Sequence, residues 1–418
     1  SANDPAGNFP IQNLPLGVFA YGSGSRIGTA IGDSVLDLAA CAEAGLIDGP
    51  AGAACREPDL NPLMALGSPH WRALRHRLSA LLRHDAPERV PLAPLLGPLG
   101  GVEMQLPARI GDYTDFYASI YHATTVGAQM RPDNPLLPNY AWVPIGYHGR
   151  ASSIVVSGTA VTRPRGQLKF DAEAAPVFAP TRRLDYELEL GAWVGPGNLL
   201  GAPVPIAGAG ARLFGVSLLN DWSARDIQRW EYQPLGPFLA KNFATSVSPW
   251  VVTLDALAPF RCPAFPRDSA HPQPLPYLND PADQAGGGLD IILEVLLSTS
   301  MMRARGDAPH PLSRGSSRDL YWTLAQMLAH HSSGGCNLRP GDLLGTGTVS
   351  GPAPESRGCL LELTDGGKAP ITLPSGETRR FLEDGDEVIL RGRCAREGFR
   401  GIGLGECRGI VNSAQRME

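Results

Sequence analysis

The chain has 418 residues, of which 43% are hydrophobic and 18% charged, and its formal net charge is −5. This length suits two or three domains with their own cores, and the charged fraction lies below the about 25% of an average soluble protein, which excludes disorder driven by charge. Like charges form no block, so the sequence predicts neither a nucleic-acid-binding surface nor a polybasic membrane patch. We expect a small-molecule partner.

No apolar run approaches the about 18 residues that span a bilayer, and residues 1–9 lack a basic stretch followed by an apolar one. The seven cysteines are odd in number, scattered, and never in a C-x-x-C pair. This usage fits a reducing compartment rather than a disulfide or zinc framework. We expect a soluble cytoplasmic protein whose cysteines are small buried hydrophobic residues.

In chain order, residues 17–39 alternate as strand, turn and strand, and residues 65–82 have helical spacing of apolar side chains. The Pro- and Gly-rich residues 91–101 indicate a connection. The sequence thus predicts a small β-rich N-terminal domain over 1–110 and a second domain over 111–418.

The second domain alternates short strands with turn signals, which makes the expected fold mainly β with some helix, an α+β protein. Two helices are predicted, near 224–230 and 320–331. The proline-rich residues 258–281 are interpreted as a long surface loop.

Between Arg183 and Gly191, leucines and a tyrosine alternate with Asp185, Glu187 and Glu189. This period of two predicts a strand with one acidic face. That face could simply contact water. Alternate residues on one face lie about 7 Å apart, so two carboxylates could also converge on a hard cation, which prefers oxygen ligands.

Asp221 follows the apolar residues 213–219 and stands where a helix is expected to begin. It is a candidate metal ligand, with a helix N-cap as the alternative. Arg225 and Gln228 share one face of that helix, and Tyr232 lies one turn further. A helical ion pair between Asp221 and Arg225 is also possible.

Asp115 precedes His122 by seven residues, so a helix over both would place them on one face, although a lone histidine on a helix is often structural. The glycine-rich residues 345–351 lack the G-K-[ST] of a phosphate loop, and their glycines are better suited to letting backbone approach a ligand. Lysine occurs only at Lys169, Lys241 and Lys368, so each marks a position that could require a compact ammonium.

Longer strings extend from residue 9 to residue 407. They are FPIQNLPLGVF (9–19), DYTDFY (112–117), LLPNY (136–140), PIGYHGRASS (144–153), LDYELE (184–189), NDWSARDIQRWEYQPLGPF (220–238), VSPWVV (247–252), HHSSGGCNLRPGDLL (330–344), GTGTVSGPAPE (345–355) and FRGIGLGEC (399–407). Together they resemble the fumarylacetoacetase family. The resemblance implies a small SH3-like β-barrel, a larger catalytic domain of β-sandwich-roll form, and a homodimer.

The same resemblance implies a site, residue by residue. The implied divalent-cation ligands are Asp115, Glu187, Glu189 and Asp221. The implied general base is His122, with Glu362 as its partner, although the residue pattern alone would put Glu362 on the solvent face of a strand. The implied substrate contacts are Tyr117, Arg131, Tyr147, Arg225, Gln228, Tyr232 and Thr348. Lys241 and Thr245 would lie beside a second cation near Asp221, which Lys241 could meet only through backbone oxygen because an ammonium has no lone pair to offer.

The implied reaction is hydrolysis of the carbon–carbon bond of 4-fumarylacetoacetate, with Mg²⁺ or Ca²⁺ and no organic cofactor. Arg225, Gln228 and Lys241 would stabilise the oxyanion. Ala240 and the pair Ile120–Tyr121 depart from the family's usual residues without removing a site residue. Two alternatives stay open: an acylpyruvate hydrolase or 2-oxo-acid hydratase or decarboxylase of the same superfamily, and a metal-binding module without catalysis.

Overall fold

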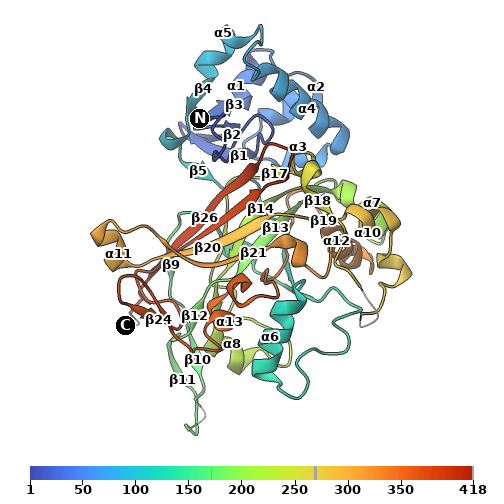
Figure 1. Cartoon of the computed structure of the whole chain (residues 1–418). Coiled ribbons are helices and arrows are strands. Elements are labelled where there is room, and N and C mark those ends of the chain that lie inside the picture. Colours follow the sequence, from blue (N-terminus) through green and yellow to red (C-terminus); the bar gives the residue numbers. More distant parts are fainter. Residues whose placement is uncertain (171, 268–270, 417–418) are drawn as a thin grey trace.

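The computed structural model describes residues 1–170, 172–267 and 271–416. Its N-terminal part, blue in Figure 1, is a sheet with helices packed on it and sits at one end of two long-stranded sheets. The sheet has the order β4-β3-β2-β1-β5 and consists of β1 (Leu16–Tyr21), β2 (Gly24–Ile31), β3 (Ser34–Asp37), β4 (Leu96–Pro98) and β5 (Met104–Gln105). Its helices are α1 (Leu38–Glu43), α2 (Gly49–Cys55), α3 (Asn61–Ala65), α4 (Ser68–Leu81) and α5 (Arg89–Leu92).

Local chemistry explains these elements. The carboxylate of Asp37 accepts a hydrogen bond from the Ala40 backbone N–H and so caps α1. Helix α4 buries Trp71, Leu74 and Leu78 at helical spacing. The predicted strands over 17–39 and the helix over 65–82 are confirmed. Closure of the sheet into an SH3-like barrel remains a prediction.

The central sheet carries the site. Its order is β7-β6-β22-β13-β14-β16-β8, with β17 on β14. The strands are β6 (Tyr113–Phe116), β7 (Gly146–His148), β8 (Ile154–Val156), β13 (Leu188–Val194), β14 (Leu213–Asp221), β16 (Thr245–Val247), β17 (Val252–Thr253) and β22 (Leu343–Gly345). Strands β13 and β14 are buried at every residue, as expected of strands covered on both faces.

A second sheet has the order β21-β20-β25-β26-β9 and crosses the molecule in Figure 1. Its strands are β9 (Val161–Thr162), β20 (Ile292–Ser298), β21 (His310–Ser316), β25 (Glu387–Cys394) and β26 (Ile402–Asn412). One buried cluster contains Leu218 of β14, Leu390 of β25 and Leu404 of β26, so the two sheets enclose a common core.

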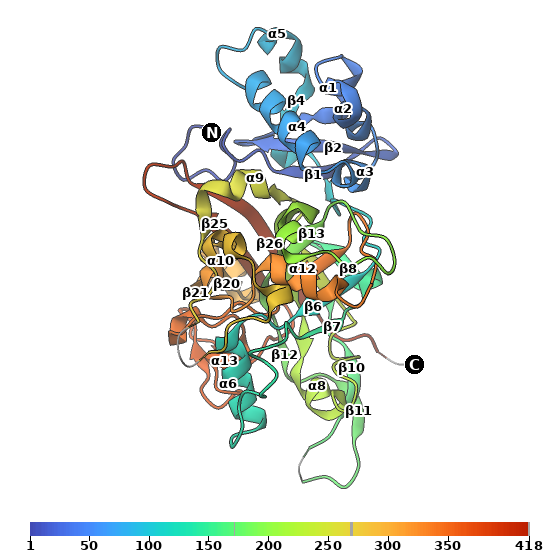
Figure 2. The ribbon, with the colours of Figure 1, turned by 90° about the vertical axis from the view of Figure 1, so that its right-hand side faces the viewer.

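Shorter elements surround these sheets. Two-stranded pairs are formed by β10 (Arg165–Leu168) with β11 (Val177–Pro180), β12 (Leu184–Asp185) with β15 (Ser223–Ala224), β18 (Arg261–Cys262) with β19 (Gly288–Leu289), and β23 (Ile371–Thr372) with β24 (Thr378–Arg379). The remaining helices are α6 (Ile120–Met130), α7 (Ile206–Ala209), α8 (Arg225–Glu231), α9 (Leu254–Leu257), α10 (Pro281–Gly286), α11 (Ser300–Arg305), α12 (Leu324–Ser332) and α13 (Leu360–Leu363). Figure 2 shows α12 and α10 near the middle of the face turned toward the viewer, and α6 beside α13.

The N-terminal part shares a core with the rest of the chain. The Trp71 ring meets the Phe214 ring edge-on, with centroids 5.0 Å apart, and Leu16 forms a β-bridge with Val251.

In the described residues, no helix combines the length and apolar character needed to cross a bilayer.

The structure corrects several local expectations. Asp115 lies on β6 and His122 on α6, so no helix carries both; helix α6 starts only after Ser119, whose hydroxyl caps it. Glu362 lies on the short helix α13 with a buried side chain, not on the solvent face of a strand. Asp221 ends β14, and the N-cap of α8 is Ala224.

Two further expectations are corrected in part. The proline-rich residues 258–281 are not a continuous loop, because they include β18 and a 3-10 turn over Pro276–Leu278, while residues 268–270 lie outside the described residues. Five of the seven cysteines are buried, but Cys262 is half-buried and Cys336 is exposed.

Candidate active site

Four acidic side chains from different elements meet in the interior. They are Asp115, Glu187, Glu189 and Asp221, all buried, and one oxygen of each can be chosen so that all lie within 4.8 Å of one another. The sheet order produces this convergence. Strand β22 lies between β6 and β13, and places Gly345 opposite both Asp115 and Gly191.

Two glycines make room for the carboxylates. A Cβ atom at Gly345 would lie 2.5 Å from Asp115 Oδ1, and one at Gly347 would lie 2.2 Å from the Phe116 carbonyl oxygen. The φ angle of Gly347 is +72°, which favours glycine. Its N–H donates to Asp115 Oδ1 (3.1 Å) and Glu189 Oε2 (3.0 Å). The glycine-rich segment thus brings the backbone N–H of Gly347 onto two of the acids.

Within the described ranges, cationic side chains form ion pairs with Glu187 and Asp221 of this cluster. The Lys241 ammonium donates to Glu187 Oε2 and to Asp221 Oδ2, the latter at 2.8 Å. Asp221 also accepts from the hydroxyls of Thr245 (2.8 Å) and Tyr147 (2.7 Å). Lys241 therefore acts here as a hydrogen-bond donor, as its chemistry requires.

The pKa values of these acids differ according to how close each acid lies to a cationic side chain. Burial and the charge of Asp221 raise the pKa of Asp115 well above its ordinary value, and burial and Asp115 do the same to the pKa of Glu189. Burial also raises the pKa of Glu187, but Lys241 and Arg225 outweigh it, so the net pKa is lowered.

Glu189 Oε1 has no hydrogen-bond partner in the part of the chain that the structure describes. No ion pair joins Asp115 or Glu189 to a cationic side chain among the described residues, whereas Glu187 and Asp221 each have at least one. The donor set consists of carboxylate oxygens only, which is the set preferred by hard divalent cations. The residues present therefore fit a divalent cation.

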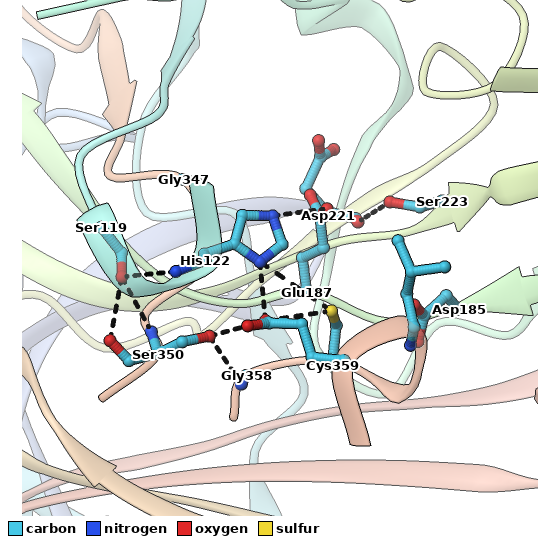
Figure 3. A network of polar contacts seen from close by, with 12 residues as sticks. Ser119, His122, Asp185, Glu187, Asp221, Ser223, Gly347, Ser350, Gly358 and Cys359 are labelled. Atoms are coloured by element: carbon cyan, nitrogen blue, oxygen red, sulfur yellow. Dashed lines mark hydrogen bonds and ion pairs between the residues drawn. The ribbon is translucent and has the colours of Figure 1, made fainter. Parts of the chain in front are cut away.

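A histidine–carboxylate pair lies beside this cluster, and Figure 3 shows its histidine, His122, near the centre of the view. His122 Nδ1 is 2.6 Å from Glu362 Oε2, and its Nε2 is 4.0 Å from Glu187 Oε1. An ionised carboxylate only accepts hydrogen bonds, so Nδ1 donates to Glu362, and in the neutral imidazole Nε2 is then the acceptor, on the side of the acids. The Tyr117 ring meets the imidazole edge-on, with centroids 5.3 Å apart.

Two further side chains hold the Glu362 carboxylate. Ser350 Oγ donates to Oε2 at 2.7 Å, and the Cys359 thiol does so at 3.3 Å. Burial would raise the pKa of Glu362, but His122 and these donors lower it on balance. Ser119, the cap of α6, donates to the Ser350 carbonyl at 2.9 Å, which joins the helix of the histidine to the support of its partner.

Arg225 also forms ion pairs with acids, but none with Asp221 in the part of the chain that the structure describes. Its Nε donates to Asp185 (2.9 Å), and its Nη1 donates to Glu187 (2.8 Å) and Gln228 (3.2 Å). The alternative of a helical Asp221–Arg225 pair is therefore wrong. Asp185 itself accepts from the backbone N–H groups of residues 360 and 361, so it fixes α13 against Arg225.

A cavity of about 520 Å³ lies next to Arg225. Its charged lining is dominated by bases, namely Arg183, Arg225, Arg229 and Lys368, against one acid, Asp365, and it also contains Gln228 and Tyr232. Arg225 Nη2, a buried donor in this wall, has no hydrogen-bond acceptor among the described residues. The cavity suits an anionic ligand.

Two predicted substrate contacts lie apart from these hydrogen bonds. Arg131 ends α6, and its Nη2 donates to the Pro135 carbonyl at 3.4 Å. Thr348 is buried, and its hydroxyl has no hydrogen-bond partner within the described ranges. Their roles remain predictions.

Sequence reasoning missed Asp185, Ser350 and Cys359 as parts of the site. Asp185 shares the alternation of Glu187 and Glu189, which was the available signal. Nothing in the local pattern distinguishes the serine or the cysteine from ordinary core residues.

Two protein-family models together match most of the chain. The model of the fumarylacetoacetate hydrolase C-terminal family matches residues 113–412, and that of the fumarylacetoacetase N-terminal family matches residues 12–107. The chain is 50% identical over 414 residues to fumarylacetoacetase of Arabidopsis thaliana, covering 97% of this chain and 96% of that protein. It is 48% identical over 417 residues to the human enzyme, with coverages of 97% and 96%.

The chain belongs to the fumarylacetoacetase family. More distant solved structures share the fold of this family. Fumarylacetoacetate hydrolase from Exiguobacterium antarcticum aligns with a TM-score of 0.52 at 18% identity, covering 96% of this chain and 99% of that chain. Maleylpyruvate hydrolase from Sphingobium sp. SYK-6, solved with manganese(II) and pyruvate, aligns with a TM-score of 0.51 at 18% identity, covering 96% and 100%. The family resemblance inferred from the sequence strings is confirmed.

Proposed function

We propose that the protein is a fumarylacetoacetase, which hydrolyses 4-fumarylacetoacetate to fumarate and acetoacetate in tyrosine and phenylalanine breakdown. Full-length identity of about half to proteins of that name supports the reaction. The buried carboxylate cluster beside the His122–Glu362 pair is the observation that carries the chemistry.

The difficulty of the reaction is a carbon leaving group, which can depart only as an enolate. A divalent cation, Mg²⁺ or Ca²⁺, held by Asp115, Glu187, Glu189 and Asp221 would supply Lewis acidity for the diketone oxygens. The substrate is then its own electron sink, so we propose no organic cofactor. A second cation near Asp221, Lys241 and Thr245 is part of the proposal, with Lys241 contributing backbone oxygen only.

His122 is the proposed general base. Its Nε2 takes a proton from water while the water oxygen bonds to the fumaryl carbonyl carbon, and Nδ1 keeps its hydrogen bond to Glu362. Collapse of the tetrahedral intermediate breaks the carbon–carbon bond, and the proton on His122 returns to the departing carbon. Fumarate and acetoacetate result.

The proposed donors for the oxyanion belong to two cationic side chains that contact Glu187. Arg225 Nη2 is unpartnered and buried, and Lys241 has a third N–H beyond its two carboxylate contacts. With Gln228 they form the proposed oxyanion site. The terminal carboxylates of the substrate would be held by Arg131 and by the side chains Tyr117, Tyr147, Tyr232 and Thr348.

The wider organisation is also proposed from the family. We infer an SH3-like N-terminal barrel over 1–110, a catalytic domain over 111–418, a homodimer, a cytoplasmic location, and a small-molecule substrate as partner, without nucleic acid or membrane. The family models divide the chain at nearly the same place, which supports the boundary.

The direct test is to incubate the protein with the diketone and follow the loss of its ultraviolet absorbance, with and without added Mg²⁺ or Ca²⁺. Acylpyruvates serve as comparison substrates. Formation of fumarate and acetoacetate supports the proposal. Turnover of acylpyruvates alone, or cation binding without any turnover, would favour one of the two alternatives.

Lys241→Arg is expected to lower kcat/KM by at least about 10²-fold, the effect of losing one oxyanion donor. The buried ammonium fits between Glu187 and Asp221, and a planar guanidinium cannot occupy the same point. Lys169→Arg, in which the ammonium meets backbone carbonyls near the surface, is the matched control. Near-normal activity of Lys241→Arg would contradict the need for a compact cation.

Replacing Arg183 and Lys368 together with glutamine is expected to raise KM severalfold, because these bases line the anionic-ligand cavity. The salt dependence of kcat/KM should become shallower, since exposed charges act through a screened field. The double variant Arg83→Gln/Arg305→Gln changes net charge equally at distant exposed sites. If both double variants behave alike, the cavity does not recruit the substrate.

Ser350→Ala is expected to lower kcat about tenfold, which corresponds to about 1.4 kcal/mol, with little change in KM. The hydroxyl fixes Glu362 and therefore the orientation of His122. Ser356→Ala, which removes a hydroxyl bonded to the Ala353 carbonyl in the same segment, is the control. Steady-state kinetics, together with thermal unfolding of the same preparation, would show whether Ser350→Ala lowers kcat or only lowers stability. A loss of activity that unfolding fully explains would contradict the positioning role.

A further inference from the structure

We propose that Cys359, with His122 and Glu362, forms an inhibitory binding site for thiophilic divalent ions, of which Zn²⁺ is the clearest case. The site is distinct from the all-oxygen cluster. Binding needs only these three side chains, whereas the inhibition rests on the proposed function of His122.

The three donor atoms already lie together. Cys359 Sγ is 3.3 Å from Glu362 Oε2 and 4.0 Å from His122 Nδ1, and these last two atoms are 2.6 Å apart. With zinc–ligand bonds of about 2.0 to 2.3 Å, a tetrahedral site requires donor separations of about 3.3 to 3.6 Å. The two distances to sulfur are close to this range. The distance between nitrogen and oxygen must open by less than 1 Å, and the distance between sulfur and nitrogen must close by a smaller amount.

The chemistry of the donors separates the two sites. Sulfur, imidazole nitrogen and one carboxylate oxygen are the ligands that zinc prefers, whereas Mg²⁺ and Ca²⁺ select oxygen. All three side chains are buried, and Cys359 is wholly inaccessible to solvent. Arg357 Nη1 lies 3.6 Å from the other oxygen of Glu362, so Oε2 is left to face the sulfur and the imidazole.

An ion at this place would switch off the base. Zinc binds an unprotonated imidazole nitrogen, so occupation of Nδ1 requires the ring proton to be on Nε2. The proton on Nδ1 is lost, one is gained at Nε2, and the thiol proton of Cys359 passes to solvent, which gives a net release of one proton for each ion bound. His122 Nε2 then donates a hydrogen bond and cannot take a proton from water.

The contacts around Glu362 allow the site to form with little rearrangement. Ser350 and Cys359 both contact the same oxygen of Glu362 as His122 does, as Figure 3 shows for the network around His122. A zinc ion would replace the hydrogen bonds of the thiol and the imidazole, while that of Ser350 can persist. The site therefore needs rotation of side chains rather than movement of strands.

The test uses the full-length protein with its oxygen site saturated by Mg²⁺. Co²⁺ is added as a spectroscopic probe, and zinc inhibition is measured against the uninhibited rate of each variant. The wild-type protein should show thiolate-to-cobalt charge-transfer absorption, removed by Zn²⁺. Cys359→Ser should lose this absorption and need at least about tenfold more Zn²⁺ for half-inhibition.

Cys336→Ser, which removes the exposed cysteine, should behave like the wild-type protein. Equal zinc inhibition of wild type and Cys359→Ser would overturn the proposal and place the inhibition at the carboxylates. Retention of the cobalt absorption in Cys359→Ser would overturn it as well. Should the protein not hydrolyse the diketone, the cobalt spectrum still decides whether Cys359 binds the ion, so failure of the proposed function and failure of this site are distinguishable.

Discussion

Replacing His122 with alanine is expected to reduce kcat by about 10²- to 10⁴-fold while leaving divalent-cation affinity nearly unchanged. The imidazole is held by Glu362 through Nδ1 and presents Nε2 toward the acids, 4.0 Å from Glu187 Oε1. Hard divalent cations select oxygen ligands, so the carboxylates rather than the imidazole are expected to hold the ion. Turnover is measured by diketone loss and cation binding by calorimetry on the same preparation.

His330→Ala is the control for this experiment, because His330 contacts the Tyr277 hydroxyl on a different part of the molecule. It should keep its activity. A parallel loss of cation affinity in His122→Ala would show that His122 belongs to the metal site rather than acting as a base. Full activity of His122→Ala would remove it from the mechanism.

The contact between His122 and Glu362 shows where local sequence patterns stop being informative. The two residues are 240 positions apart, and their contact depends on α6 and α13 packing together. Periodicity predicted helix α8 within one residue at each end, because its apolar spacing is local. It failed for Asp115, because the strand hydrogen bonds of β6 to β22 outweigh the helical spacing of a short stretch.

The acidic residues at positions 185–189 illustrate a second limit of prediction from sequence patterns. Alternation drew attention to Asp185, Glu187 and Glu189 together, but it could not tell which of them would join the buried acidic cluster. The chain leaves regular strand structure between β12 and β13, so Asp185 turns to Arg225 and α13 while the other two join Asp115 and Asp221. The separation of Asp185 from the other two acids follows from tertiary packing, which a single sequence does not reveal.

Glu189→Gln is expected to have opposite effects on cation affinity and on the stability of the ion-free protein. Glu189 has a raised pKa because it is buried beside Asp115, and no cationic side chain contacts it among the described residues. The amide oxygen of glutamine can still accept from the Gly347 N–H. Removing the charge therefore relieves repulsion when the ion is absent and removes a ligand when it is present.

The sign of the pH dependence gives an independent check. A carboxyl group whose pKa is raised in the folded state binds more protons than in the unfolded state, so the ion-free protein should lose stability as pH rises from the ordinary carboxyl pKa to the raised one. Because cation ligands must be deprotonated, cation affinity should rise over the same interval. In Glu189→Gln both pH effects should be smaller.

Thermal unfolding after chelation, repeated with added Mg²⁺ or Ca²⁺, measures both halves of this prediction. The variant should unfold at a higher temperature than the wild-type protein without ion, bind the ion at least about 10²-fold more weakly, and lose its activity in proportion. Glu187→Gln is the comparison, since Lys241 and Arg225 already neutralise that carboxylate and its removal should destabilise the ion-free protein. If both variants lose stability without ion, Asp115 and Glu189 do not repel each other, and the reason for placing a divalent cation between them disappears.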